Sequence, residues 1–472
     1  MADRRRIATT SARIVVGVVG VVIAALTLAA AGQVTVPVLS APVPQTAVSP
    51  VSSGQTRVCA GPLLALGTDG SLSAFASPDF VTASADEPKL TGVASPDNAS
   101  VESFGSPVVA HVDAGDDDGR PLLAATQSQM VNMSDLAGFT ATACGDALAE
   151  SWLVGGSSDV GRTGVISLTN PTESDATVDL EFFGENGPVD APGAGGIIVR
   201  AGEQRLFSLA GFAPDVLTSV VKVTASGGQV YATLQQSSVR GVTPAGVETV
   251  SSSQGPATTQ RIAGVIVPSD APPATDGEGY DDNVPAVRVF VPGDRDQQAN
   301  IEVSFTDESG GEAPLPITAT IYGGVVGEIP LAGVAGGSYG ITVSSDVPVV
   351  ASARTVTATG GTDFAWFTAS APLDDDVAVA VAPGPRPSLH VFNPSDTAIE
   401  GELTPDGGSA TAVNVPARSA IEVPLTASGG YTLTGASGTF AQVVYRADGA
   451  FSAFAVQPAG AEAAPVTVYP RG

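Results

Sequence analysis

The stretch ISLTNP at residues 166–171 alternates apolar and polar side chains and ends at a proline. Degenerate copies follow as VRVFVP at residues 287–292 and LHVFNP at residues 389–394. A period of two places successive side chains on opposite faces of a β-strand. Proline ends such a strand because it has no N–H to donate to the ladder, and asparagine before it favours a turn. The three copies therefore predict an internal repeat of β units.

More strands follow each copy in the same order. In the first unit Val178 and Leu180 point one way while Asp179 and Glu181 point the other, as in a half-buried strand. The next marker reads LFSL, EIPL and EVPL, at residues 206–209, 328–331 and 422–425. A closing pair of strands completes each unit. Each unit then holds roughly seven strands in roughly 100 residues, the size of an immunoglobulin-like sandwich.

We predict an all-β fold of tandem immunoglobulin-like β-sandwich repeats after one N-terminal transmembrane helix. A propeller-like ring of β units is the alternative, because the strand-like tail from residue 466 could complete a sheet edge or close a ring. The predicted segments are a cytoplasmic basic tail (1–13), a transmembrane signal anchor or signal peptide (14–32), a Pro/Ser-rich stalk (33–56), a diverged β unit with a disulfide (57–149), and β-sandwich repeats at 150–257, 258–372 and 373–472, the last with a terminal strand.

The N-terminal segment predicts the location of the protein. Residues 1–13 carry three consecutive arginines from Arg4, and residues 14–32 then run without a charge. A run of roughly 20 apolar residues is long enough to span a bilayer as a helix. The basic flank predicts a cytoplasmic N-terminus, with the rest of the chain outside the cytoplasmic membrane. The small residues around Ala31 leave open a second interpretation, in which a signal peptide is cleaved there and the protein is secreted.

Composition limits the classes of partner. The chain of 472 residues has 48 acidic and 20 basic residues, a net charge of −28. Nucleic acid is excluded as a natural partner, because neutralising phosphates requires clustered lysine and arginine. The 55 glycines and 36 prolines indicate frequent turns and short strands. The acidic residues are expected to keep a surface rich in valine and alanine soluble.

Cys59 and Cys144 are the two cysteines of the chain. Outside the cytoplasm we expect them to form a structural disulfide. Closing a loop of this length stabilises the fold by roughly 4–5 kcal/mol in the chain-entropy model. We predict no metal site, because two cysteines and two histidines this far apart do not have the spacing of a ligand set.

Two motifs or residues resemble catalytic groups. Gly336-Gly337-Ser338-Tyr339-Gly340 matches the G-x-S-x-G pattern of a hydrolase nucleophile elbow. That elbow needs a strand-to-helix turn, whereas this match precedes a repeat strand and is better explained as a glycine-rich turn. His390 is a candidate general base. Its counterparts in the other copies are Ser167 and Arg288, which predicts an exposed residue on the polar face of a strand. His111 is likewise expected on a strand.

Acidic and aromatic residues give no specific site either. The run Asp113–Gly119 lacks two of the ligands of a calcium loop, and Asp276–Asp282 and Asp374–Asp376 are expected to be solvated linkers. Trp152 is expected to pack near the disulfide, and Trp366 in the core. We therefore predict no catalytic, cofactor-binding or metal-binding residues and no cofactor.

Three short motifs resemble a known family. They are RVCAGP from Arg57, ATACGDA from Ala141 and SWLVGG from Ser151, followed by the first strand that ends in Asn-Pro. With the basic start, the single apolar span and the β repeats, they resemble the actinobacterial envelope family catalogued as domain of unknown function 5719. The resemblance covers nearly the whole chain. It implies a secreted or membrane-anchored protein without assigned activity, often encoded near a family-2 glycosyltransferase.

The predicted function is that of an uncharacterised extracytoplasmic envelope protein, a non-catalytic scaffold or interaction protein. The resemblance favours an envelope protein or glycan as its partner, and residues 14–32 predict contact with the cytoplasmic membrane. The alternative is a carbohydrate-binding or carboxylate-based glycan-processing protein. Acids with raised pKa values in a cleft would favour the enzyme, and aromatic residues exposed in a groove would favour the binding module.

Overall fold

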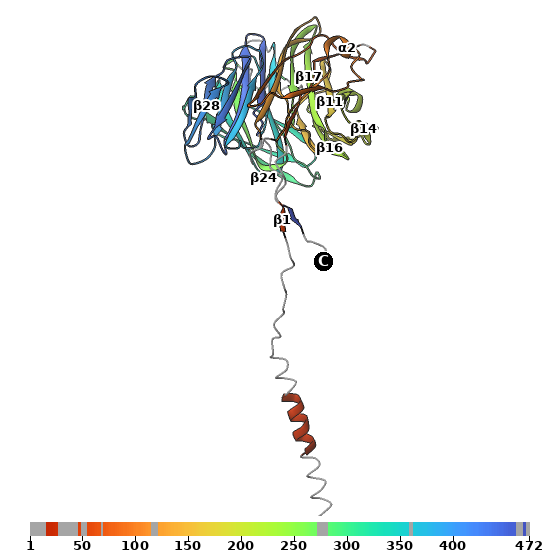
Figure 1. Ribbon diagram of the computed structural model, residues 1–472, viewed down its shortest axis with the longest axis vertical. Helices are drawn as coiled ribbons and strands as arrows, with labels where there is room; N and C mark the ends of the chain where they lie inside the picture. The colour runs from red at the N-terminus through yellow and green to blue at the C-terminus, as the bar shows by residue number, and fades with distance from the viewer. Residues whose placement is uncertain are drawn as a thin grey trace, which may run out of the picture. The chain divides into compact units, whose positions relative to one another are not determined.

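The computed structural model describes residues 16–26, 46–48, 54–67, 69–114, 121–270, 282–357, 362–458 and 466–468 (Figure 1). The chain divides into a small unit, Met1–Val51 with Ala463–Gly472, and one compact unit from Ser52 to Glu462. The helices of the described residues are short: residues 16–26, α2 (Val101–Phe104) and α3 (Leu209–Phe212). Nearly all other regular structure in these residues is β-strand, so the predicted all-β class is confirmed.

The small unit contains the helix over residues 16–26 and an antiparallel pair of β1 (Thr46–Val48) and β34 (Val466–Val468). Within the described ranges, no helix combines the length and the apolarity needed to cross a membrane. The rest of the predicted span 14–32, including Ala31, lies outside these ranges, and so does the basic tail 1–13. The terminal strand β34 pairs with β1, which lies in the segment predicted as the stalk.

The segment from Glu150 to Val250 forms two antiparallel sheets with a shared core. The strands of the first sheet are β10 (Glu150–Val154), β16 (Val220–Ser226), β12 (Ala176–Gly184), β13 (Gly187–Val189) and β14 (Ile197–Val199); those of the second are β15 (Glu203–Ser208), β11 (Arg162–Asn170), β17 (Tyr231–Arg240) and β18 (Thr243–Val250). Buried side chains of both sheets meet, among them Val178 and Val223 from the first and Ile166 and Leu234 from the second. Apolar burial of this kind stabilises by about 25 cal/mol per Å².

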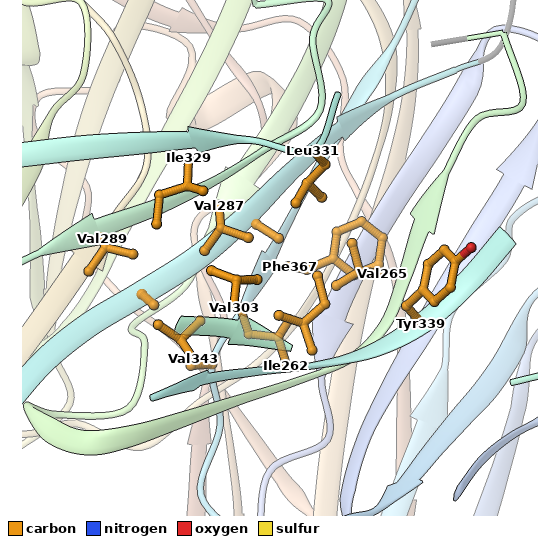
Figure 2. Packing of buried hydrophobic residues seen from close by; sticks show 14 of the residues in the cluster. Ile262, Val265, Val287, Val289, Val303, Ile329, Leu331, Tyr339, Val343 and Phe367 are labelled. Atoms are coloured by element: carbon orange, nitrogen blue, oxygen red, sulfur yellow. The ribbon is translucent and has the colours of Figure 1, made fainter. Parts of the chain in front are cut away.

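The next segment uses one long strand in both of its sheets. Its strands are β19 (Ala257–Val267), β20 (Ala286–Phe290), β21 (Gln298–Asp307), β22 (Ile317–Tyr322), β23 (Val326–Pro330), β24 (Gly337–Val356) and β25 (Phe364–Thr368). The first half of β24 pairs with β19 and β21, and its second half pairs with β20 and β25. Val287 and Val289 of β20 face Val303 of β21 and Val343 of β24 across the core (Figure 2).

The last segment has the same two-sheet layout. One sheet orders β26 (Asp376–Val381), β31 (Gly429–Thr434), β28 (Ile399–Pro405) and β29 (Thr411–Val415); the other orders β30 (Ser419–Pro424), β27 (Ser388–Asn393), β32 (Phe440–Ala447) and β33 (Ala450–Ala455). Leu389 and Val443 of the second sheet pack against Val379 and Leu433 of the first.

The first segment of the compact unit is the one that carries the cysteines. Its strands are β2 (Gln55–Val58), β3 (Leu64–Leu66), β4 (Leu72–Ala74), β5 (Asp79–Ser84), β6 (Lys89–Gly92), β7 (Val108–Val112), β8 (Leu123–Asn132) and β9 (Ala137–Ala143). They form the sheets β2-β7-β6 and β5-β8-β9 and the pair β3-β4. Cys59 and Cys144 are joined by a disulfide, as the sequence predicted.

The three proline-ended stretches form β11, β20 and β27. Each lies between two strands that follow it in the chain, which are β15 and β17, β23 and β24, and β30 and β32. Asparagine fixes the turn after two of them. The amide Nδ2 of Asn170 donates to the carbonyls of Ser174 at 2.7 Å and Val199 at 3.0 Å. Asn393 donates in the same way to Thr397 at 2.8 Å and Val415 at 3.2 Å. The asparagine side chain thereby ties each strand end to the strands that return beside it.

The last strands of four sheets meet at the centre of the compact unit. β9 packs against β18 and β33, and β25 also packs against both. These four strands come from the four successive segments, so the segments share one central core. The strands of the described residues form no closed barrel. The immunoglobulin-like topology, the propeller-like ring and the domain boundaries stay predictions.

Candidate functional site

A cavity of about 350 Å³ opens between the last two segments. The end of β19 and the start of β24 form one wall, where Gly336, Gly337 and Ser338 lie. Arg386 and Arg446 line the cavity from the last segment, with Asp448, Phe451 and several backbone positions completing it. A cavity with two guanidinium groups and few competing charges is suited to a small anionic ligand.

The backbone holds the two arginines of this cavity together. Arg386 has a φ of 41°, in the left-handed region that non-glycine residues rarely occupy. Its Nε donates to the carbonyl of Arg446 at 3.1 Å. Arg446 makes a long ion pair of 3.8 Å to Glu422, and both of these side chains are substantially exposed. Strained backbone of this kind is often found where a side chain must be aimed at a ligand.

The G-x-S-x-G match lies at this cavity without the geometry of a nucleophile elbow. Gly336 is in a bend, and β24 begins at Gly337 and continues as a strand through Gly340. A Cβ on Gly336 would lie 2.5 Å from the Cα of Ser269, so the glycine allows two backbone segments to approach closely. Ser338 therefore contributes a polar group to the cavity wall from a strand.

His390 is buried, and the prediction of an exposed strand residue was wrong. Its side chain is 0% exposed, because the polar face of β27 is covered by β19 and by the turn after β21. Gly264 makes this contact possible, since a Cβ there would lie 2.6 Å from the Cβ of His390. His111, in contrast, lies on β7 as predicted, with Nδ1 2.8 Å from the hydroxyl of Thr56.

Two hydrogen bonds connect His390 to a serine and a glutamate. Its Nδ1 is 2.7 Å from Oε2 of Glu308, and its Nε2 is 2.9 Å from Oγ of Ser388. Serine, histidine and carboxylate stand in the same order in serine hydrolases. Here both Ser388 and His390 are buried between sheets, and Ser388 is not among the residues that line the cavity. Ser388 is therefore not placed to attack a ligand bound in the cavity.

A pair of buried carboxylates lies where the four inner strands meet. Asp363, directly before β25, accepts backbone N–H bonds from Phe139 and Phe451 at 2.9 Å, from Phe364 at 3.0 Å and from Val247 at 3.2 Å. These donors belong to β9, β33, β25 and β18, so one carboxyl group connects all four strands. Burial raises the pKa of Asp363 to about 8, although the four N–H bonds act in the opposite direction.

Glu248 of β18 is the second member of this centre. Its Oε1 accepts hydrogen bonds from the hydroxyls of Thr140 at 2.8 Å and Ser452 at 2.9 Å, which come from β9 and β33. Burial raises its pKa well above the ordinary value, and the charge of Asp363 adds to the shift. Both carboxyl groups are fully buried and accept several hydrogen bonds from neighbouring strands. We therefore interpret them as structural groups that hold the strands together. Neither Glu248 nor Asp363 was among the candidate residues predicted from the sequence.

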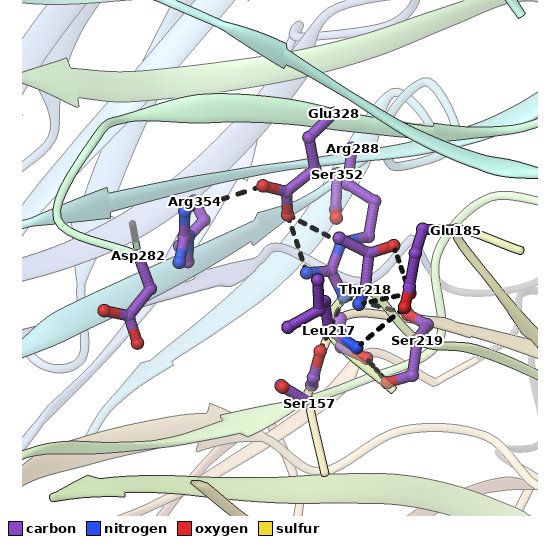
Figure 3. Close-up of polar contacts among 12 residues, drawn as sticks. Ser157, Glu185, Leu217, Thr218, Ser219, Asp282, Arg288, Glu328, Ser352 and Arg354 are labelled. Atoms are coloured by element: carbon purple, nitrogen blue, oxygen red, sulfur yellow. Dashed lines mark hydrogen bonds and ion pairs between the residues drawn. The ribbon is translucent and has the colours of Figure 1, made fainter. Parts of the chain in front are cut away.

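Buried arginines join the two middle segments (Figure 3). Arg288 contacts Oε1 of Glu328 at 2.6 Å and donates to the carbonyls of Gly156 and Ser219 in the neighbouring segment. Arg354 pairs with the other carboxylate oxygen of Glu328 at 3.7 Å. Both guanidinium groups also lie over the indole ring of Trp366, at 4.6 and 5.9 Å from its centroid.

The remaining sequence candidates are distributed over the molecule. Trp366 is a core residue, as predicted, whereas Trp152 packs with Phe290 and not in the cluster around the disulfide. Asp374–Asp376 are exposed, as expected of a solvated linker. Of Asp113–Gly119, residues 113 and 114 are described and exposed, and residues 115–119 lie outside the described ranges.

Asp282 departs from the prediction of a solvated linker, while residues 276–281 before it lie outside the described ranges. It is buried and pairs with Arg162 at 3.1 Å and Arg240 at 3.0 Å. Burial alone would raise its pKa, but the charges of Arg354, Arg162 and Arg240 outweigh it and lower the pKa of Asp282 to about 2.

Comparison with known proteins identifies the family. A family model described as "Family of unknown function (DUF5719)" matches residues 98–426. The chain belongs to this family. The match confirms the resemblance drawn from the sequence and covers more than two thirds of the chain. No curated protein and no solved structure matches the chain. Within the DUF5719 match lie Glu248, Asp363 and Arg386, whereas Arg446 lies beyond it.

Proposed function

We propose that this DUF5719 chain is a non-catalytic extracytoplasmic interaction protein that binds an anionic group of an envelope partner, above all an acidic glycan. The observation that carries the proposal is the arginine-lined cavity. Arg386 and Arg446 meet there in a chain with a net charge of −28 and only 20 basic residues. Guanidinium groups recognise carboxylates and phosphates by paired hydrogen bonds.

Several other arginines are already engaged in buried or partly buried ion pairs. Arg57 pairs with Asp146, Arg162 with Asp282, and Arg288 with Glu328. At the cavity, by contrast, Arg386 is exposed and Arg446 has only a long contact to a carboxylate. A volume of about 350 Å³ is at the lower end for ligand pockets and suits one or two sugar rings.

The rest of the chain supports a binding role at a fixed place in the envelope. Residues 14–32 would anchor the protein in the cytoplasmic membrane, or be cleaved near Ala31 to release it, and the predicted stalk 33–56 would hold the compact unit outside. The β segments are internal repeats with immunoglobulin-like topology in this proposal. Their shared centre, where the carboxyl group of Asp363 accepts N–H bonds from several strands, holds them in one compact unit, which would keep a binding cavity between two segments in shape.

The test is calorimetric titration of the full chain in detergent with a hexuronate tetrasaccharide and with a neutral glucose tetrasaccharide. We expect the acidic sugar to bind. The double variant Arg386→Ala/Arg446→Ala should lower the affinity for this sugar at least tenfold, since charge-assisted hydrogen bonds contribute about 1.5–3 kcal/mol each. Arg200→Ala is the matched control, because Arg200 is exposed and lies outside the cavity.

Two results would overturn parts of the proposal. Equal binding of both sugars, or unchanged binding by the double variant, would remove the cavity from the account. If chromatography shows that the acidic tetrasaccharide is shortened during the titration, the non-catalytic role is contradicted. Binding to the acidic sugar should also weaken as salt is added, because exposed charges are screened over about 10 Å at 0.1 M ionic strength.

A further inference from the structure

We propose that Glu308, His390 and Glu422 form a binding site for a divalent transition-metal ion of the zinc type. The site lies between the last two segments of the compact unit. Glu308 comes from the turn that follows β21, His390 from β27 and Glu422 from the adjacent strand β30. The inference rests on other side chains than the anion-binding proposal, although Glu422 also makes the 3.8 Å ion pair to Arg446 of that cavity.

The distances fit a small ion after modest side-chain movement. One ligand atom from each of the three residues lies within 4.8 Å of the other two. The shortest separation is 2.7 Å, between Nδ1 of His390 and Oε2 of Glu308. A tetrahedral ion with bonds of about 2.0–2.2 Å holds its ligand atoms about 3.4 Å apart. The 2.7 Å separation is shorter than that value and the other two are at most 4.8 Å, so movement of the side chains is enough to bring the three atoms to an ion.

A second observation points to a ligand at this place. The side chain of Glu308 is only 6% exposed, yet its Oε1 has no hydrogen-bond partner among the described residues. Buried carboxylate oxygens without a partner are costly and uncommon in folded proteins. A cation bound between Glu308, His390 and Glu422 would satisfy this oxygen.

The surroundings of His390 match those of a metal ligand. Its Nε2 is 2.9 Å from Oγ of Ser388. With an ion on Nδ1, the Nε2–H group would donate to this oxygen and hold the ring in place. With the imidazole neutral, the two glutamates supply two negative charges to a divalent ion. One nitrogen and two carboxylates favour zinc-like ions over calcium or magnesium, which prefer oxygen ligands alone.

The site is open to solvent on the side of Glu422. Its side chain is 39% exposed, so an ion can enter from solvent although His390 is fully buried. Three protein ligands leave a fourth position open, as in zinc sites that bind water or a ligand group. An ion held by β27, β30 and the turn after β21 would also join the last two segments.

The experiment uses the full chain, treated with a chelator and then titrated with Zn²⁺ by calorimetry and with Co²⁺ by visible absorption. We expect one Zn²⁺ per chain and the intense bands of a four-coordinate Co²⁺ site. Glu422→Gln should lower the affinity at least tenfold and abolish the Co²⁺ bands. This variant alters a half-exposed side chain and leaves the buried residues intact. Glu402→Gln, an exposed glutamate on β28, is the matched control and should bind as the unaltered chain does.

The opposite results would overturn the assignment. They are the absence of stoichiometric Zn²⁺ binding, a Co²⁺ spectrum typical of six-coordinate surface binding, or equal affinity in the Glu422→Gln and unaltered chains. His390→Ala serves as a second variant and should lose binding completely. Circular dichroism shows whether that chain still folds, and if it does not, Glu422→Gln alone decides the question.

Discussion

Replacing Asp363 by alanine should destabilise the whole compact unit and not one segment alone. The carboxyl group of Asp363 accepts four backbone N–H bonds, one from each of the four inner strands. Two glycines allow it to approach these strands. A Cβ on Gly138 or on Gly246 would lie 2.7 Å from its Oδ1. Alanine would therefore leave all four N–H groups buried without their acceptor.

The size of the effect follows from those four groups. A buried donor left without a partner costs about 1–3 kcal/mol. Four of them give about 4 kcal/mol as a lower value, even before the loss of packing around the removed carboxyl group. Since a typical domain is stable by about 5–15 kcal/mol, this loss is a large part of the total.

The assay is urea unfolding at pH 6, followed by the fluorescence of the buried Trp152 and Trp366 and by circular dichroism. Coincident transitions would show that unfolding is cooperative and can be treated as two-state. Asp375→Ala is the control, because Asp375 is exposed and should change stability by less than about 0.5 kcal/mol. A loss below about 1 kcal/mol for Asp363→Ala, or separate unfolding of the segments, would refute the reasoning.

Four further predictions concern stability and reactivity. Because burial raises the pKa of Asp363 to about 8 from 3.8, the unfolded chain releases this proton at lower pH than the folded chain does. The free energy of unfolding should fall between about pH 4 and pH 8, and Asp363→Asn should make that slope shallower by up to about 1.4 kcal/mol per pH unit. Reducing the Cys59–Cys144 disulfide, whose cysteines are 85 residues apart, should cost about 4–5 kcal/mol in urea unfolding, and a cost below 1 kcal/mol would contradict this. Glu328→Ala should cost about 3–5 kcal/mol in the same assay, since two buried guanidinium groups lose their carboxylate. A fluorophosphonate serine probe should leave Ser388 unlabelled in the folded chain, as judged by peptide mass spectrometry; labelling would restore the hydrolase interpretation.

Period-two patterns predicted the strands and their faces well. Leu389 and Val391 face the core of their own segment, and His390 faces the other way, as the alternation in LHVFNP requires. The pattern does not tell whether a polar face meets water or another part of the chain. Ser167, Arg288 and His390 occupy matching positions and are all buried, because the sheets also pack against neighbouring segments.

The candidate sites could not be predicted from spacing along the chain. Glu308 is 82 residues from His390, and the two meet only because β27 packs over β19 and the turn after β21. The prediction of no metal site rested on the spacing of the cysteines and histidines and on the missing ligands of a calcium loop at Asp113–Gly119. The other carboxylates were too numerous to select a pair. Asp363 likewise has no local signature, since its partners are backbone N–H groups of four separate strands.

The most direct test of the binding function is affinity capture from a cell-envelope extract with the full chain as bait, in parallel with the Arg386→Ala/Arg446→Ala variant and the Arg200→Ala control. Captured glycans and proteins are identified by mass spectrometry. The account predicts that an acidic glycan is retained by the unaltered chain and by the control and is lost with the double variant. Retention by all three baits, or a glycan without acidic groups, would contradict it.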